Sequence, residues 1–238
     1  MVIDGGLPTR AFADLLESHG DLIDVVKFGW GTSVVTAGMH RKADAARANG
    51  VDFYFGGTLF EKFVIQDRFD DWRRFVDGFG ATTIEISNGT IDLSNEDKAA
   101  YVSRLAGDYA VYSEVGFKDS AKAEGMGSAL WLEYIRQDLD AGAVKVITEA
   151  RESGTSGIVH ADGTLRTDLV DDILASGVPV AQLMFEAPTK ALQLYLITRV
   201  GSSVNLGNIA PADVIPLETL RLGLRGDTLM EMENTDHA

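Results

Sequence analysis

The chain of 238 residues contains no cysteine, which excludes disulfide bonds, thiolate catalysis and cysteine-based metal sites. It has only four histidines (His19, His40, His160 and His237), and they are scattered over stretches that read as helix or loop, so a zinc centre is not expected. No run of about 18 apolar residues is present to cross a bilayer, and the N-terminus lacks the basic and apolar regions of a signal peptide. We therefore expect a cytoplasmic protein.

Positive charge is also scarce. The chain has 21 Lys and Arg residues against 36 Asp and Glu residues, a net charge of −15. Such a surface disfavours nucleic acid and anionic membranes, and an anionic substrate would need a local basic pocket. With 45% hydrophobic residues the chain can bury one sizeable core, so we expect one domain over residues 1–238, with a flexible acidic tail at residues 229–238. The sequence leaves a homo-oligomer open.

Eight short apolar runs rich in Val, Ile and Phe divide the chain. Their near-continuous apolar character, without strict alternation, predicts parallel strands that are covered on both faces. The runs are Val2–Asp4, Val25–Phe28, Val51–Phe55, Thr82–Ile86, Ala110–Val115, Val144–Glu149, Val180–Phe185 and Ser203–Leu206.

The stretches between these runs contain apolar residues at helical spacing and end at helix stop signals. The predicted helices are Arg10–Ser18, Thr36–Ala48, Phe69–Phe79, Ser94–Leu105, Leu130–Ala141, Leu169–Ala175, Lys190–Val200 and Asp213–Leu224. Eight strand-plus-helix units with short connections predict an α/β fold, a single-domain (β/α)8 TIM barrel.

Five apolar runs end in a carboxylate, namely Asp4, Glu85, Glu114, Glu149 and Glu186. A sixth ends in Lys27, and a late run ends in Asn205. One such acid could be a helix cap or a solvated loop residue. Buried acids are costly unless they are paired or bound to a metal, and the carboxyl ends of barrel strands meet at one face. Five acids in register therefore predict an active site at that face.

Three of these acids, Glu114, Glu149 and Glu186, end consecutive strands, so their carboxylates can converge on one hard cation. Mg²⁺ is bound in proteins by few carboxylates, with waters and an anionic substrate completing its ligands. The sequence therefore predicts a Mg²⁺ cofactor.

Basic residues lie close to these acids along the chain, namely Lys27, Lys118, Arg151 and Arg225. Either lysine could be no more than a salt-bridge partner. The loop Glu152–Gly157 offers small residues and free N–H groups, which suit a phosphate or sulfonate nest. The segments Gly56–Thr58 and Gly207–Asn208, after the third and eighth strands, have a similar composition.

Several longer stretches are distinctive: MVIDGGLP, VVKFGWGTS, YFGGTLFEK, IEISNGTIDL, SEVG, TEARESG, MFEAPTK, VNLGNIAP and LETLRLGLRGDT. In these stretches, which span almost the whole chain, the sequence resembles the phosphosulfolactate synthase family of coenzyme M biosynthesis. The resemblance implies a (β/α)8 barrel and a carbon–sulfur lyase. The implied reaction adds sulfite to C3 of phosphoenolpyruvate, with Mg²⁺, to give (2R)-phospho-3-sulfolactate through an enediolate-type intermediate.

Position along the chain then suggests roles for single residues. Glu114, Glu149 and Glu186 are the expected metal ligands, and Lys118 is the expected proton donor, with Lys27 as its rival. Glu85 is a further catalytic candidate. The expected substrate-binding residues are Arg151, Ser153, Gly154, Gly157, Asn205 and Arg225.

Two other interpretations stay open at the level of sequence. The first is a barrel aldolase or another enolate-forming enzyme, with Lys145 as the candidate Schiff-base residue. Lys145 shares a strand face with Ile147 and Glu149, however, and would lie below both, near the floor of the barrel. The second is a non-catalytic, anion-binding, stress-associated barrel, which would bind ligand without turnover.

Overall fold

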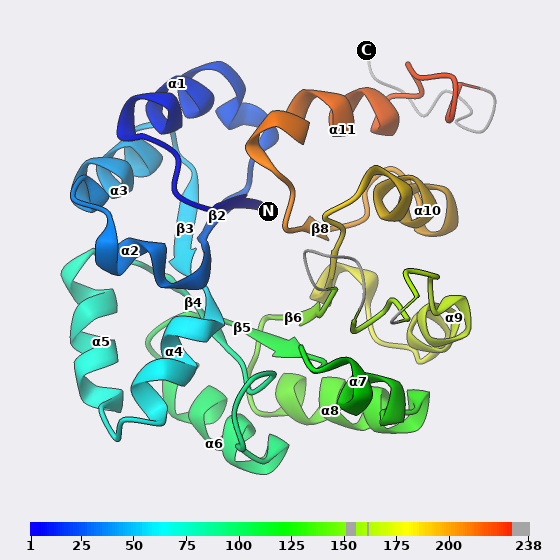
Figure 1. Ribbon diagram of the computed structural model, residues 1–238, viewed down its shortest axis with the longest axis horizontal. Coiled ribbons are helices and arrows are strands. Elements are labelled where there is room, and N and C mark those ends of the chain that lie inside the picture. The colour runs from blue at the N-terminus through cyan, green and yellow to red at the C-terminus, as the bar shows by residue number, and fades with distance from the viewer. Residues whose placement is uncertain (151–155, 161, 230–238) are drawn as a thin grey trace.

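The chain forms a ring of helices around a central set of parallel strands (Figure 1). The computed structural model describes residues 1–150, 156–160 and 162–229. Its strands are β1 (Val2–Asp4), β2 (Val25–Phe28), β3 (Asp52–Phe55), β4 (Thr83–Ile86), β5 (Ala110–Val115), β6 (Lys145–Thr148), β7 (Leu183–Glu186) and β8 (Leu206–Gly207). The sequence predicted eight strands at about these positions, and the described part of the chain contains eight.

Helices connect the strands and cover their outer face (Figure 1). The α-helices are α1 (Thr9–His19), α2 (Thr32–Val35), α3 (Met39–Ala48), α4 (Gly57–Val64), α5 (Phe69–Gly78), α6 (Asn95–Leu105), α7 (Ser120–Gly125), α8 (Ser128–Asp140), α9 (Thr167–Ala175), α10 (Lys190–Val200) and α11 (Val214–Arg221). Short 3-10 helices are η1 (Gly20–Leu22), η2 (Gly29–Gly31), η3 (Val180–Gln182) and η4 (Pro211–Asp213). Among the helices of the described residues, none has both the length and the apolar character needed to cross a bilayer.

Backbone pairing joins the strands in the order β1-β2-β3 and β4-β5-β6-β7-β8, and every pair is parallel. The end of β8 meets β1, because Ile3 N donates to Ile209 O at 3.0 Å and Ile209 N to Met1 O at 3.2 Å. Strands β3 and β4 meet through side chains, where the Thr83 hydroxyl donates to the Asp52 carboxylate. The expected (β/α)8 barrel is confirmed.

Two apolar clusters stabilise this arrangement. The larger one lies between the sheet and the helices and includes the fully buried Trp72 and Trp131. The smaller one fills the barrel interior with Met1, Val25, Tyr54, Ile147 and Met184. Because side chains two residues apart on a strand share a face, the residues above the smaller cluster also point into the barrel.

Two strand predictions miss the observed bounds by more than one residue. Residues Val180–Gln182 form η3 instead of a strand, because Pro179 favours a turn whose carbonyl accepts from Gln182 N at 2.8 Å. The last strand is Leu206–Gly207 and not Ser203–Leu206. The Arg221 side chain donates hydrogen bonds to the carbonyls of Ser202 and Val204, so these carbonyls do not pair with a neighbouring strand.

Three short helices, α2, α4 and α7, have no counterpart among the predicted helices. Helix α4 begins at Gly57 without a side-chain cap, so the sequence carries no start signal for it. The single domain over residues 1–238 stays a prediction, and the expected tail beyond Leu229 lies outside the described residues.

Candidate active site

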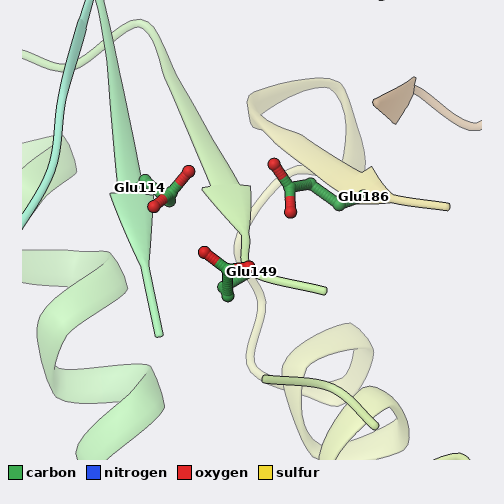
Figure 2. Close-up of side chains that lie close together, drawn as sticks. All are labelled: Glu114, Glu149 and Glu186. Carbon is green, nitrogen blue, oxygen red and sulfur yellow. The ribbon is translucent and has the colours of Figure 1, made fainter. Parts of the chain in front are cut away.

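Four carboxylates meet at the C-terminal end of the strands. Glu85 belongs to β4, Glu114 to β5 and Glu186 to β7, and Glu149 follows β6 directly. Each of these residues is at most 2% exposed. Glu114, Glu149 and Glu186 each contribute one oxygen to a group in which all oxygens lie within 4.8 Å of one another. Figure 2 shows these three side chains reaching toward a common point from their separate strands.

The strand pattern explains why these acids point inward. Glu149 lies two residues after Ile147, and Glu186 two residues after Met184, and both apolar residues belong to the cluster inside the barrel. The acids therefore form the next layer above that cluster.

Lys27 of β2 is the central cation of this layer. Its Nζ lies 3.0 Å from Glu85 Oε2, 3.3 Å from Glu186 Oε1 and 3.5 Å from Glu114 Oε2. Burial acts to lower the pKa of Lys27, but the three carboxylates outweigh it and hold that pKa well above its ordinary value. Lys27 is thus a fixed positive charge at neutral pH.

Lys118 reaches the same layer from the loop that follows β5. Its Nζ lies 3.4 Å from Glu114 Oε1 and 3.9 Å from Glu149 Oε2, and it donates to Thr58 Oγ1 at 3.3 Å. Burial acts to lower the pKa of Lys118, but Glu114 and Glu149 raise it above its ordinary value. Its side chain is 29% exposed, against 8% for Lys27, so Lys118 is the lysine that a ligand reaches more readily.

The carboxylates titrate in different directions. Burial acts to raise the pKa of Glu114, yet Lys118 and Lys27 lower that pKa to about 2. Burial together with Glu114 raises the pKa of Glu186 to about 7 despite Lys27. Burial and the neighbouring acids also raise the pKa values of Glu149 and Glu85. Without a further cation, this cluster therefore holds protons that isolated carboxylates would lose.

Backbone N–H groups orient two of the acids. Glu85 Oε1 accepts from Gly57 N at 2.5 Å, at the start of α4. Glu186 Oε2 accepts from Ala150 N at 2.9 Å. Helix α4 and the loop after β6 thus fix the carboxylates of two different strands.

Two glycines allow the chain to pass close to Glu149. Gly157 has a φ of +76°, and a Cβ atom there would lie 1.7 Å from Glu149 O. Gly116 has a φ of +126°, and a Cβ atom there would lie 2.6 Å from the Glu149 Cβ. Gly157, which we expected to bind substrate, therefore packs against the backbone of Glu149, and its carbonyl accepts from Arg166 at 3.2 Å.

A cavity of about 830 Å³ opens above the layer of acids and lysines. Apart from that layer, its wall is formed by Ile3, Trp30, Thr58, Thr90, Pro188 and Asn208, among others. Trp30 is 51% exposed and has a left-handed φ of 49°. The cavity can therefore admit a small anionic ligand to both lysines.

Asn208 lies where the substrate-binding Asn205 was expected. The Asn205 amide donates to Leu183 O at 2.9 Å, at the start of β7, so Asn205 lies at the opposite end of the barrel from the acids. Asn205 precedes β8 instead of ending it, and this is why the prediction is wrong. Asn208, with a φ of 54°, follows β8 and lines the cavity.

Two further residues were expected at the active site, namely Asp4 and Arg225. Asp4 was expected in the ring of carboxylates, but its side chain accepts from Gly6 N at 2.8 Å and Leu7 N at 2.7 Å and pairs with Lys42 at 2.5 Å. Arg225 follows α11 and is not among the described residues that line the cavity, so its substrate-binding role stays a prediction. Arg151, Ser153 and Gly154 lie outside the described residues.

Lys145, the candidate Schiff-base residue, lies on the floor of the barrel. Its Nζ donates to Ala181 O at 2.7 Å, just before β7 begins. It lies four residues before Glu149 on the same strand face, near the floor as the sequence predicted, and it does not line the cavity. This placement gives no support to the aldolase interpretation.

The residues present fit a hard divalent cation. The ligand set of Glu114, Glu149 and Glu186 offers only oxygen atoms, which Mg²⁺ prefers. Four carboxylates face two ammonium groups, so full ionisation leaves two uncompensated negative charges. Within the described residues, Glu114 Oε1 and Glu149 Oε2 are buried and accept no hydrogen bond.

Solved structures define the class of protein. The chain is similar to a 3-hexulose-6-phosphate synthase, with a TM-score of 0.54 and 13% identity, covering 87% of this chain and 90% of that one. It is also similar to a 3-keto-L-gulonate-6-phosphate decarboxylase from Vibrio cholerae, with a TM-score of 0.54 and 10% identity, covering 98% and 97% of the two chains. At such identities the likeness concerns the fold alone, that of a TIM barrel.

Sequence comparison is more specific. The family model for (2R)-phospho-3-sulfolactate synthase (ComA) matches residues 1–227. The phosphosulfolactate synthase of Bacillus subtilis is 49% identical over 228 residues, covering 96% of this chain and 90% of the relative. That of Methanocaldococcus jannaschii is 41% identical over 232 residues, covering 96% and 92%. The chain belongs to the phosphosulfolactate synthase family, so the expected enzyme class, a carbon–sulfur lyase, is confirmed.

Proposed function

We propose that this enzyme adds sulfite to C3 of phosphoenolpyruvate and forms (2R)-phospho-3-sulfolactate at the mouth of the barrel. One observation carries the proposal: in a member of the phosphosulfolactate synthase family, three buried carboxylates and two lysines line one cavity. The substrate carries a phosphate and a carboxylate, and sulfite is a second anion. The two ammonium groups, together with a bound cation, would offset the repulsion of these anions from an acidic protein.

Glu114, Glu149 and Glu186 would hold a Mg²⁺ ion. Their converging oxygens and the two excess negative charges of the layer support this assignment. When bound, the ion would supply a positive charge that stabilises the enediolate-type intermediate. The raised pKa values of Glu149 and Glu186 support this role, because a bound cation would favour the ionised form of both carboxylates.

Lys27 would bind the carboxylate of phosphoenolpyruvate. Its Nζ lies in the cavity wall and is held by three acids, so its position is fixed before the substrate arrives. Preorganised charge of this kind is favourable because little reorganisation accompanies the reaction. Glu85, the acid closest to Lys27, would act by positioning that lysine, since Gly57 N and Lys27 occupy its two oxygens.

Lys118 would donate the proton. The sulfur lone pair forms the C–S bond at C3 while the electron pair of the C2–C3 double bond moves toward the carboxylate. Lys118 Nζ then gives a proton to C2, and the proton that bisulfite releases restores the ammonium group. The raised pKa keeps Lys118 protonated at neutral pH, and its exposure lets it reach the substrate.

Asn208 would hydrogen-bond the substrate from the opposite wall. Its side chain lines the cavity, where the amide Nδ2 can donate to an anionic oxygen of the substrate. A left-handed backbone is uncommon for a residue other than glycine, and such conformations cluster at ligand sites.

A direct assay tests the proposal. The protein is incubated with phosphoenolpyruvate, sulfite and Mg²⁺, and phosphorus NMR follows the conversion of the enol phosphate into phosphosulfolactate. We expect turnover that stops when Mg²⁺ is chelated and that is lost in the variant Glu149→Gln. Absence of product above the uncatalysed background, with a folded protein and Mg²⁺ present, would refute the proposal.

A further inference from the structure

A second buried ion pair lies behind the acids, on the outer side of β5. Lys98 of α6 and Asp138 of α8 are both fully buried, and their Nζ and Oδ2 atoms are 2.7 Å apart. Asp138 also accepts from Ser113 Oγ at 2.7 Å and from Asn95 Nδ2 at 3.3 Å. A buried ion pair costs desolvation, and apolar residues in its place are often as stable. The stability of the fold therefore does not explain this pair.

The pair touches the site through the backbone. Lys98 Nζ donates to Glu114 O at 2.8 Å. The last residue pair between β4 and β5 joins Ile86 and Ser113, so Glu114 lies one residue beyond that ladder. The ammonium group thus supplies a hydrogen bond to a carbonyl that the neighbouring strand no longer reaches.

The position of the Glu114 carboxylate depends on this backbone hydrogen bond more than the positions of the Glu85 and Glu186 carboxylates depend on theirs. Backbone N–H groups bind the carboxylates of Glu85 and Glu186. The carboxylate of Glu114 is instead held by other side chains, those of Lys27, Lys118 and Glu149. Gly116, with a φ of +126°, follows closely and lets the chain turn away from the strand.

We propose that Lys98 and Asp138 are positioning residues, which fix the peptide of Glu114 and thereby place its carboxylate for the cation and for both lysines. The metal part of this inference rests on the proposed function. Asp138 acts through Lys98, because it neutralises the buried ammonium group and is itself anchored by Ser113 on β5.

The test removes the charge of the pair in one step. The double variant Lys98→Met with Asp138→Asn keeps the side-chain volumes and leaves no buried charge without a partner. The matched control is Lys42→Met with Asp4→Asn. That pair is equally buried, at 1% exposure for each side chain, but it binds the loop between β1 and α1 instead of a peptide of the acid cluster.

Titration calorimetry with Mg²⁺ and thermal unfolding are compared for the two double variants. We expect similar changes in Tm, but a Mg²⁺ affinity that falls by about 10-fold or more only in the Lys98 and Asp138 variant. Equal Mg²⁺ affinities in the two variants would overturn the proposal. A merely structural pair would change Tm without this difference.

Hydrogen exchange provides a readout that needs no metal. In the metal-free Lys98 and Asp138 variant, amides at residues 113–118 should exchange faster than in the parent, while those of β2 stay unchanged. Unchanged exchange at the end of β5 would also overturn the positioning role. If Glu114→Gln binds Mg²⁺ as tightly as the parent, the metal site itself is wrong, and hydrogen exchange alone decides the role of Lys98.

Discussion

Lys27 and Lys145 both lie on strand faces that point into the barrel, yet they have opposite surroundings. At the mouth, Lys27 Nζ is within 3.5 Å of three carboxylates and lines a cavity. At the floor, Lys145 Nζ donates to the carbonyl of Ala181. The floor leaves backbone carbonyls without a strand partner, and polar side chains are used to satisfy them. At the mouth, the carboxylates of Glu85 and Glu186 instead accept hydrogen bonds from backbone N–H groups.

The two asparagines near β8 repeat this contrast. Asn205 donates to the carbonyls of Leu183 and Ala181 at the floor, whereas Asn208 lines the cavity with a buried, unpartnered Oδ1 in the described part of the chain. Side chains at the mouth are left able to bind a ligand, and those at the floor are not. Residue type alone therefore does not indicate function in this barrel.

Replacement of the proton donor should have the largest effect. In Lys118→Met we expect kcat to fall by about 10²- to 10⁴-fold, because protonation of C2 loses its acid. The affinity for Mg²⁺ should not fall, because Lys118 competes for the oxygens of Glu114 and Glu149. Steady-state kinetics and calorimetry measure the two quantities.

The neighbouring Lys122 offers a control for that variant. Its side chain is exposed on α7 and lies 5.9 Å from the centre of the Phe117 ring. Lys122→Met should keep kcat within about two-fold, as expected for a surface residue. A kcat in Lys118→Met close to that of the parent would show that another group protonates C2.

The two interior lysines provide the next test. Lys27→Met should lower kcat/KM by about 10²- to 10³-fold, since it removes a preorganised charge from the reacting centre. Lys145→Met should leave kcat/KM nearly unchanged, because its Nζ serves only a floor carbonyl. An equal loss of kcat/KM in the two variants would contradict the difference between mouth and floor. Lys145 would then be a candidate catalytic residue.

The asparagines should show a smaller effect. Asn208→Gly removes the amide where the φ of 54° suits glycine, so the fold should not be weakened. We expect KM for phosphoenolpyruvate to rise about 10-fold, which corresponds to one lost hydrogen bond to a charged group. Asn205→Ala should lower Tm instead and leave KM unchanged, because its amide binds Leu183 O. The reverse pattern in kinetics and thermal unfolding would contradict this assignment.

Much of the site could be predicted because strand ends are local features. Glu85, Glu114, Glu149, Glu186 and Lys27 each end an apolar run, and parallel strands bring such residues together. Asn205 was misplaced because the predicted strand ended too early. A barrel strand is only a few residues long. An error of a few residues in its bounds therefore moves a side chain from the mouth of the barrel to its floor.

Other features have no local signal. Lys98 and Asp138 lie on two separate helices, where charged residues are usually solvated, and only the packing of α6 and α8 on β5 brings them together. Asp4 has the same position at a strand end as the acids of the site, but the tight turn at Gly6 and Leu7 supplies N–H groups that bind its carboxylate. Such contacts depend on tertiary structure and were not predictable.

The stability of the metal-free protein should report the acid cluster through its dependence on pH. The folded pKa of Glu186, about 7, lies above the ordinary value of 4.5, so the folded state holds a proton that the unfolded state loses. Stability should therefore fall as pH rises from about 4.5 to about 7, with a decrease in Tm on the order of a few degrees. Mg²⁺ should reverse this decrease, because it replaces the proton, and Glu186→Gln should reduce it. Lys145→Met should keep the full dependence, and the same reduction in both variants would show that the effect does not originate at the mouth.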